Sequence, residues 1–173
     1  MFDKLTLRKA TQDDADRIWE ILQQAILKRK EEGSTQWQEG YPNPNVINDD
    51  ITKGIGYVVF HSENNSIIGY VVIMDDIEPA YNELSGGKWL TDGKYVVVHR
   101  LATAQDVKIK GLGTWVMQQV ENVALSKNIT SIKVDTNFDN DGMLRVFEKL
   151  NYIYCGEVFF RGGSRRAFEK LLV

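Results

Sequence analysis

The sequence has little of what marks secreted, membrane-spanning or nucleic-acid-binding proteins. Cys155 is the one cysteine in 173 residues, so the chain cannot form an internal disulfide, and a lone thiol suits a reducing compartment. The longest apolar run, residues 67–74, falls far short of the ~20 apolar residues that span a bilayer. With 21 basic and 24 acidic residues, there is no positive excess for binding a phosphate backbone. We therefore expect a cytoplasmic protein without membrane or nucleic-acid partners.

The composition that remains is that of a globular domain. Apolar residues make up 43% and charged residues 26% of the chain, close to the average for soluble proteins. The sequence has no internal repeat, no low-complexity tract and no linker rich in proline, glycine or serine. A chain of this length can bury a substantial core. We therefore predict a single domain over residues 1–173.

Apolar periodicity predicts alternating strands and helices. A helix opens at Thr11, where Asp14 stands three residues on as in a capping box, and it ends near Gly33. The order of elements is strand, helix, helix, three strands, helix, strand, helix and two strands, which predicts an α/β (α+β) fold with a mixed sheet. The predicted strands are 5–8, 57–61, 67–74, 95–102, 132–136, 152–160 and 166–173, and the later helices are 46–53, 111–128 and 143–150.

The most informative segment joins the strand at 95–102 to the following helix. A polar loop leads to Gly111 and Gly113, which open that helix, and Lys108 and Lys110 stand beside them. Glycine lets a ligand approach the backbone closely, and the first N–H groups of a helix attract phosphate. The segment therefore favours a phosphate or pyrophosphate site.

Two common nucleotide motifs do not fit this segment. Residues 111–116 contain no third glycine, so they are not a dinucleotide fingerprint, and no Gly-Lys-Ser/Thr ends a Walker A loop. An ordinary strand-to-helix turn remains an alternative on these residues alone.

The same segment resembles the acetyl-CoA loop of the GNAT (GCN5-related N-acetyltransferase) superfamily. That pattern is Arg/Gln-x-x-Gly-x-Gly/Ala after a strand, and residues 108–113 match it with lysine at the first position. Lysine keeps a donor but loses the guanidinium fork. Downstream, 134–136, Asn140 and 151–156 are similar to later parts of the family pattern, although its usual Gly-Phe is Asn151-Tyr152 here.

The resemblance implies a fold, a reaction and a set of cofactor contacts. The fold would be a mostly antiparallel mixed sheet flanked by helices, and the enzyme would transfer acetyl from acetyl-CoA directly to a primary amine. Backbone groups of Leu101, Ala102 and Thr103 would hold the pantetheine arm and polarise the thioester carbonyl. Asn140 would contact the CoA arm. The pyrophosphate would be held by Lys108, Ile109, Lys110, Gly111, Leu112, Gly113 and Thr114.

The proton-transfer groups do not follow from the resemblance. Many relatives place a tyrosine seven residues after the position of Asn140, and this chain has Phe147 there, which cannot donate a proton. Candidates that remain are His99, whose ordinary pKa suits a base, together with Asp135 and Tyr152. An acyl-CoA-binding regulatory module without catalysis is therefore the alternative function, and a different nucleotide-binding α/β protein is a third. We expect no metal.

The acceptor is a small-molecule or peptide amine that the sequence does not identify. Trp37 and Tyr41 lie in a turn-rich loop, where aromatic side chains either cage a substrate or cap the core beneath. Asp135 could hold a cationic amine, or it could be a solvent-facing strand-end carboxylate. The family resemblance also allows a homodimer.

Overall fold

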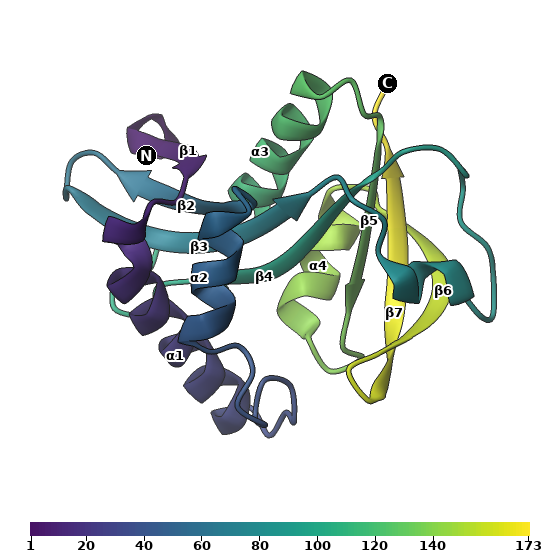
Figure 1. Ribbon diagram of the computed structural model, residues 1–173, viewed down its shortest axis with the longest axis horizontal. Helices are drawn as coiled ribbons and strands as arrows, with labels where there is room; N and C mark the ends of the chain where they lie inside the picture. The colour runs from purple at the N-terminus through teal and green to yellow at the C-terminus, as the bar shows by residue number, and fades with distance from the viewer. The chain divides into compact units, whose positions relative to one another are not determined.

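The computed structural model describes residues 1–173, and its elements match the predicted order. Seven strands form one sheet in the order β1-β2-β3-β4-β5-β7-β6, in which the β4–β5 pair is parallel while β1–β2, β2–β3, β5–β7 and β6–β7 are antiparallel. The mixed, mostly antiparallel sheet is confirmed. The elements are β1 (Leu5–Lys9), α1 (Ala15–Glu31), α2 (Pro44–Thr52), β2 (Gly56–His61), β3 (Ser66–Met74), β4 (Val96–Thr103), α3 (Leu112–Ser126), β5 (Ser131–Thr136), α4 (Asp141–Lys149), β6 (Ile153–Phe160) and β7 (Gly163–Leu171), as Figure 1 shows.

The chain forms two compact units. The first comprises Met1–Ile73 and His99–Val116, and the second comprises Met74–Val98 and Met117–Val173. Strand β4 and helix α3 each contribute residues to both units.

Local sequence signals set the helix boundaries of the first unit. The predicted capping box is present: the backbone N–H of Thr11 donates to Asp14 Oδ2 at 2.8 Å at the short 3-10 helix Gln12–Asp14 that leads into α1. Gly33 takes φ +80° just beyond the end of α1, the left-handed conformation that commonly ends helices. Helix α2 begins two residues before the predicted start, because Asn43 caps it and Pro44 occupies its first turn.

Strands β2 and β3 form the predicted hairpin at the centre of the first unit. Nearly every residue of both strands is buried, as expected for strands covered on both faces. From α1, Ile18, Ile21 and Leu22 are fully buried, and Ile47 of α2 is 1% exposed. Figure 1 shows α1 and α2 lying alongside each other in this unit.

The second unit folds its long loop, residues 75–95, over one side of β5, β7 and β6. The loop contains a short 3-10 helix (Pro79–Glu83), and Tyr81 packs in a cluster with Val97, Val158 and Ala167. Ser85 pairs with Glu157 by two backbone hydrogen bonds of 2.8 Å. Because β6 is the edge strand, this bridge protects part of an otherwise open edge.

Candidate active site

The loop between β4 and α3 turns into the helix at a glycine. Gly111 takes φ +82°, a conformation that side-chain-bearing residues rarely adopt. The N–H of Leu112 closes a turn onto the Ile109 carbonyl at 3.2 Å, and α3 starts there. Lys108 and Lys110 are exposed on the loop. A helix N-terminus that follows a glycine turn flanked by lysines can bind a phosphate group.

An aromatic pair, Phe2 and Trp115, packs beside Gly111 of this loop. The Phe2 ring stacks on Trp115 of α3, with centroids 6.5 Å apart and planes 17° from parallel. A side chain at Gly111 would place its Cβ 3.5 Å from Phe2 Cζ. Phe2 therefore closes the face of Gly111 that a side chain would occupy, and it braces the first turn of α3.

Strand β4 carries a charged residue, Arg100, that is hydrogen-bonded to Asp50 and Tyr41. Arg100 has φ +51°, and its guanidinium makes two hydrogen bonds to the Asp50 carboxylate, Nε to Oδ2 at 3.0 Å and Nη2 to Oδ1 at 2.6 Å. Its Nη1 donates to the Tyr41 hydroxyl. The Tyr70 hydroxyl donates to Asp50 Oδ2 at 2.8 Å, and burial raises the pKa of Tyr70. The group therefore ties the α1–α2 loop and α2 to β4 immediately beside Leu101.

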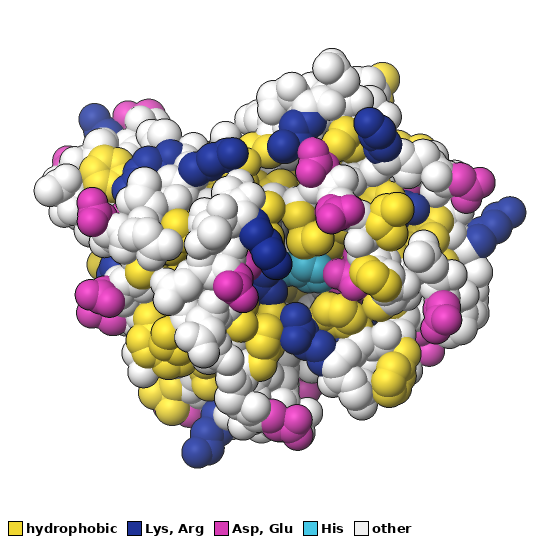
Figure 2. All heavy atoms as spheres, in the orientation of Figure 1, with side chains coloured by type: hydrophobic (Ala, Val, Ile, Leu, Met, Phe, Trp, Pro, Cys, Tyr) yellow, Lys and Arg dark blue, Asp and Glu magenta, His cyan; other side chains and the backbone are white.

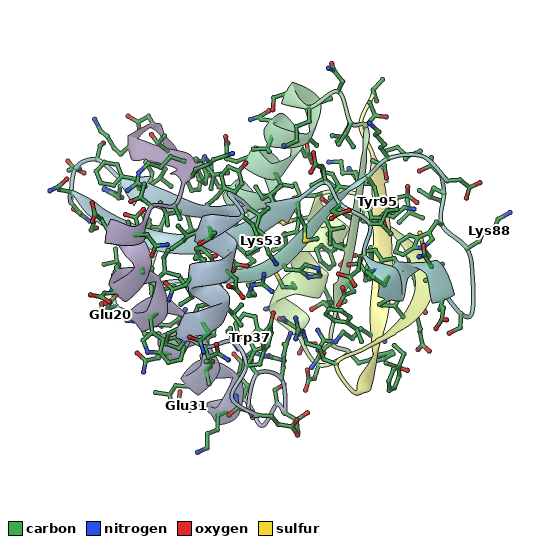
Figure 3. All side chains as sticks on the ribbon, in the orientation of Figure 1. Glu20, Glu31, Trp37, Lys53, Lys88 and Tyr95 are labelled. Atoms are coloured by element: carbon green, nitrogen blue, oxygen red, sulfur yellow. The ribbon has the colours of Figure 1, made fainter.

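Trp37 lies in the α1–α2 loop, between two residues whose side chains are hydrogen-bonded. It is half-buried at φ +63°, uncommon for a bulky residue. The Gln38 amide donates to the carbonyls of Ile26 and Gln36 at 2.9 and 3.0 Å, and Arg29 Nε donates to Gln36 Oε1 at 3.1 Å. Figure 3 shows Trp37 in the loop that follows α1, past Glu31. The loop is thus held on both sides of Trp37.

The remaining site candidates differ in how they are held. His99 is half-exposed on β4 in the first unit. Asp135 and Asn140 belong to the second unit: Asp135 Oδ2 accepts from Tyr81 at 2.6 Å, and its Oδ1 lies 3.6 Å from Arg165 Nη1. Its side chain is only 2% exposed. Asn140 caps α4 by accepting from the Met143 N–H at 3.3 Å.

Tyr152, the candidate acid, and Phe147, which stands where the family resemblance implies a tyrosine, both lie in the core of the second unit. Tyr152 is 6% exposed, its hydroxyl has no hydrogen-bond partner, and burial raises its pKa. The predicted strand began at Tyr152, whereas β6 begins one residue later, at Ile153. Phe147 is 1% exposed and packs against the rings of Tyr152 and Phe168, with centroids 5.2 and 5.1 Å apart. Cys155 is buried, and burial raises the pKa of its thiol.

Sequence reasoning missed Asp50, Arg100 and Tyr70. Arg100 did carry a signal, since a charged residue inside an apolar strand needs a partner when it is buried. Nothing local marks Asp50 as that partner, because it is one of several polar residues at 48–50. Arg17 and Gln24 of α1, which bond the loop after β4, were missed for the same reason.

On the face seen in Figure 2, side chains of both charges are mixed, with Lys and Arg interspersed with Asp and Glu. No group of three His, Cys, Asp or Glu side chains is arranged to hold a metal ion. None of the helices combines the length and the apolar character that crossing a membrane would require.

Comparison with known proteins identifies the family. The family model described as "Acetyltransferase (GNAT) family" matches residues 16–152, and the chain belongs to that family. A GNAT-family acetyltransferase from Streptococcus agalactiae is 30% identical, with 98% of this chain and 96% of that one covered and a TM-score of 0.89. No curated protein matches the chain. The protein is therefore an acyltransferase of the GNAT class, as the sequence predicts.

Two more distant structures share the fold. A GNAT-family acetyltransferase from Listeria monocytogenes is 18% identical, with 97% of this chain and 95% of that one covered and a TM-score of 0.75. An N-acetyltransferase from Staphylococcus aureus is 14% identical, with 98% and 99% covered and a TM-score of 0.68.

Proposed function

We propose that the protein transfers the acetyl group of acetyl-CoA directly to a primary amine on a small-molecule or peptide acceptor. The observation that carries this proposal is the loop before α3, where Gly111 at φ +82° precedes the helix N-terminus and exposed Lys108 and Lys110 flank it. Membership of the acetyltransferase family supports the reaction type. The pyrophosphate would lie against 108–114. The first N–H groups of a helix have no carbonyl acceptor within that helix, so they are available to bind phosphate.

The acetyl group would lie along β4. Backbone groups of Leu101, Ala102 and Thr103 would hold the pantetheine arm and stabilise the charge that develops on the thioester oxygen. Asn140 would contact the CoA arm. Its Oδ1 already accepts the Met143 N–H, so the amide nitrogen is the part of that side chain that would reach the cofactor.

For the proton of the acceptor amine we propose His99. It is half-exposed on β4, one residue from Arg100 and two from Leu101. Asp135 fits a base less well because Tyr81 and Arg165 already engage its carboxylate. Tyr152 fits an acid less well because its hydroxyl is buried and its pKa is raised. A coenzyme A thiolate would then leave without protein assistance.

We propose that Trp37 and Tyr41 line the acceptor site. Both belong to the α1–α2 loop, and the Tyr41 hydroxyl is bonded to Arg100 beside the proposed acetyl position. Asp135 stays a candidate for holding a cationic amine, although Tyr81 and Arg165 already engage its carboxylate. The lone buried thiol of Cys155 favours a cytoplasmic location.

The test is calorimetric titration of acetyl-CoA into the wild type and into Gly111→Asp. A carboxylate at Gly111 repels pyrophosphate and strains a backbone at φ +82°. We expect wild-type binding that is lost in the folded variant, followed by thiol release with a subset of a broad amine panel. Absence of wild-type binding would overturn the proposal. Binding without turnover on any amine would select the regulatory acyl-CoA-binding module, which the buried Phe147 favours.

A further inference from the structure

The segment that leads from β4 to the proposed cofactor loop is attached to helix α1 through one arginine. Arg17 Nη1 and Nη2 donate to the two carboxylate oxygens of Asp106 at 3.0 and 2.9 Å, and Arg17 Nε donates to the Ile67 carbonyl at 3.0 Å. One guanidinium thus joins α1, the end of the β2–β3 hairpin and the loop. A two-point bond of this kind fixes orientation as well as distance.

A glutamine two helical turns further along α1 holds the same segment. Gln24 Oε1 accepts the backbone N–H of Gln105 at 2.7 Å, and Gln24 Nε2 donates to Asp106 Oδ2 at 3.1 Å. Gln105 Nε2 in turn donates to the Thr103 carbonyl at 3.0 Å at the end of β4. Residues seven apart lie on the same helix face, so Arg17 and Gln24 form a single surface against which 103–106 is laid.

This attachment is built at the surface, where it adds little to global stability. The Arg17 side chain is 24% exposed and the Asp106 side chain 49% exposed. Exposed ion pairs are typically worth under about 1 kcal/mol of folding free energy. The principal effect of these bonds is therefore on the position of the loop rather than on the stability of the fold.

The arginine also neutralises an acid beside the loop. Asp106 stands two residues before Lys108, and the hydrogen bond from Arg17 lowers the pKa of Asp106 to about 2. Its carboxylate is therefore ionised at neutral pH. Without the arginine, the negative charge of Asp106 would disfavour a pyrophosphate bound at 108–114.

We propose that Arg17 and Gln24 are positioning residues for acetyl-CoA: they set the geometry of the cofactor loop and neutralise Asp106 without touching the cofactor. The inference rests on the proposed function, because it assigns pyrophosphate binding to 108–114. Helix α1 would then contribute to cofactor affinity, although it lies far from the glycine loop in the sequence.

The experiment measures acetyl-CoA dissociation constants for four proteins: wild type, Arg17→Met, Asp106→Asn and the double variant. We expect Arg17→Met to weaken binding about tenfold, the equivalent of one hydrogen bond to a charged group. Asp106→Asn in the Arg17→Met background should recover part of the loss, because it removes the negative charge that Arg17 no longer balances. In steady state, the KM for acetyl-CoA should rise while kcat and the acceptor KM stay unchanged. Lys28→Met removes the same charge from an exposed position of α1 and should bind as the wild type does.

The outcomes separate the inference from the function on which it rests. Wild-type binding with equal affinity in Arg17→Met would overturn the inference and leave the proposed function intact. A wild type that does not bind acetyl-CoA would overturn both. Loss of affinity that Asp106→Asn does not relieve would overturn the electrostatic part. If Arg17→Met does not fold, Gln24→Ala removes the bonds to Gln105 and Asp106 and must itself raise the acetyl-CoA dissociation constant.

Discussion

The Arg100 guanidinium and the Asp50 carboxylate form a two-point ion pair between β4 and α2, with side chains only 10% and 4% exposed. Such a pair is costly to break, since removing one partner leaves a buried charge uncompensated. Asp50→Asn should therefore lower the free energy of unfolding by about 3 kcal/mol or more, measured by urea denaturation. Asp49→Asn, at an exposed position of the same helix, is the matched control.

The same pair predicts how two substitutions combine. Replacing both partners by apolar residues of similar size, Asp50→Leu with Arg100→Met, should cost less than the sum of the two single changes, because no charge is left unpaired. Additive losses would show that the two side chains contribute to stability independently.

Local signals in the sequence were enough to predict most of the fold. The Thr11–Asp14 capping box, the glycine at 33 and the apolar runs of β2 and β3 act within a few residues of one another, so their pattern is visible in one chain. The glycine turn before α3 is similarly local, since Gly111 stands directly before that helix, and its use as a cofactor loop stays a prediction. Partners of buried charges are not local: Arg100 finds Asp50 fifty positions away, and Glu169 finds its donors in the loop at 90–91 and in β5.

Glu169 is fully buried, and its carboxylate organises the loop that covers β5 and β7. It accepts from the N–H groups of Leu90 and Thr91 at 2.6 and 3.3 Å, from Thr91 Oγ1 at 2.5 Å and from Ser131 Oγ at 2.7 Å. Glu169→Gln puts an amide donor among these donors and should cost about 2 kcal/mol of stability. Glu148→Gln, exposed on α4, should leave the urea midpoint almost unchanged. A Glu169→Gln midpoint equal to that of the wild type would contradict this account.

Gly87 is required by a close approach of two backbones. A Cβ at this position would lie 2.0 Å from the Cys155 carbonyl oxygen, and neither backbone can move away as a flexible side chain could. Gly87→Ala should therefore destabilise the protein by about 1–3 kcal/mol through overpacking. Gly93 belongs to the same loop, and a methyl group there would meet no atom within 4 Å, so Gly93→Ala should be neutral or slightly stabilising. Thermal unfolding of both variants tests the difference. Equal changes in Tm for Gly87→Ala and Gly93→Ala would contradict the prediction.

The Asp14 carboxylate makes the free energy of unfolding fall as the pH is lowered into the acid range. The hydrogen bond from Arg8 is the main cause that lowers the pKa of Asp14 in the folded state. Because the folded pKa lies below the unfolded value of about 3.9, this contribution is present above about pH 4 and is lost as the pH falls through the folded pKa. Asp14→Asn should therefore be less stable than the wild type near neutral pH, with a smaller gap in acid. Urea midpoints measured across this range test it, with Asp13→Asn as an exposed control.

Phe147 occupies the position at which the family resemblance implies a tyrosine, and its surroundings predict what a hydroxyl there would do. The side chain is 1% exposed, with the rings of Tyr152 and Phe168 about 5 Å away between centroids. Phe147→Tyr adds a polar group to a filled apolar site, which should cost about 1–3 kcal/mol without raising kcat. Urea denaturation measures the first effect, and thiol release from acetyl-CoA with an accepted amine measures the second. A higher kcat at unchanged stability would instead mean that the new hydroxyl reaches the leaving thiolate and can act there as an acid.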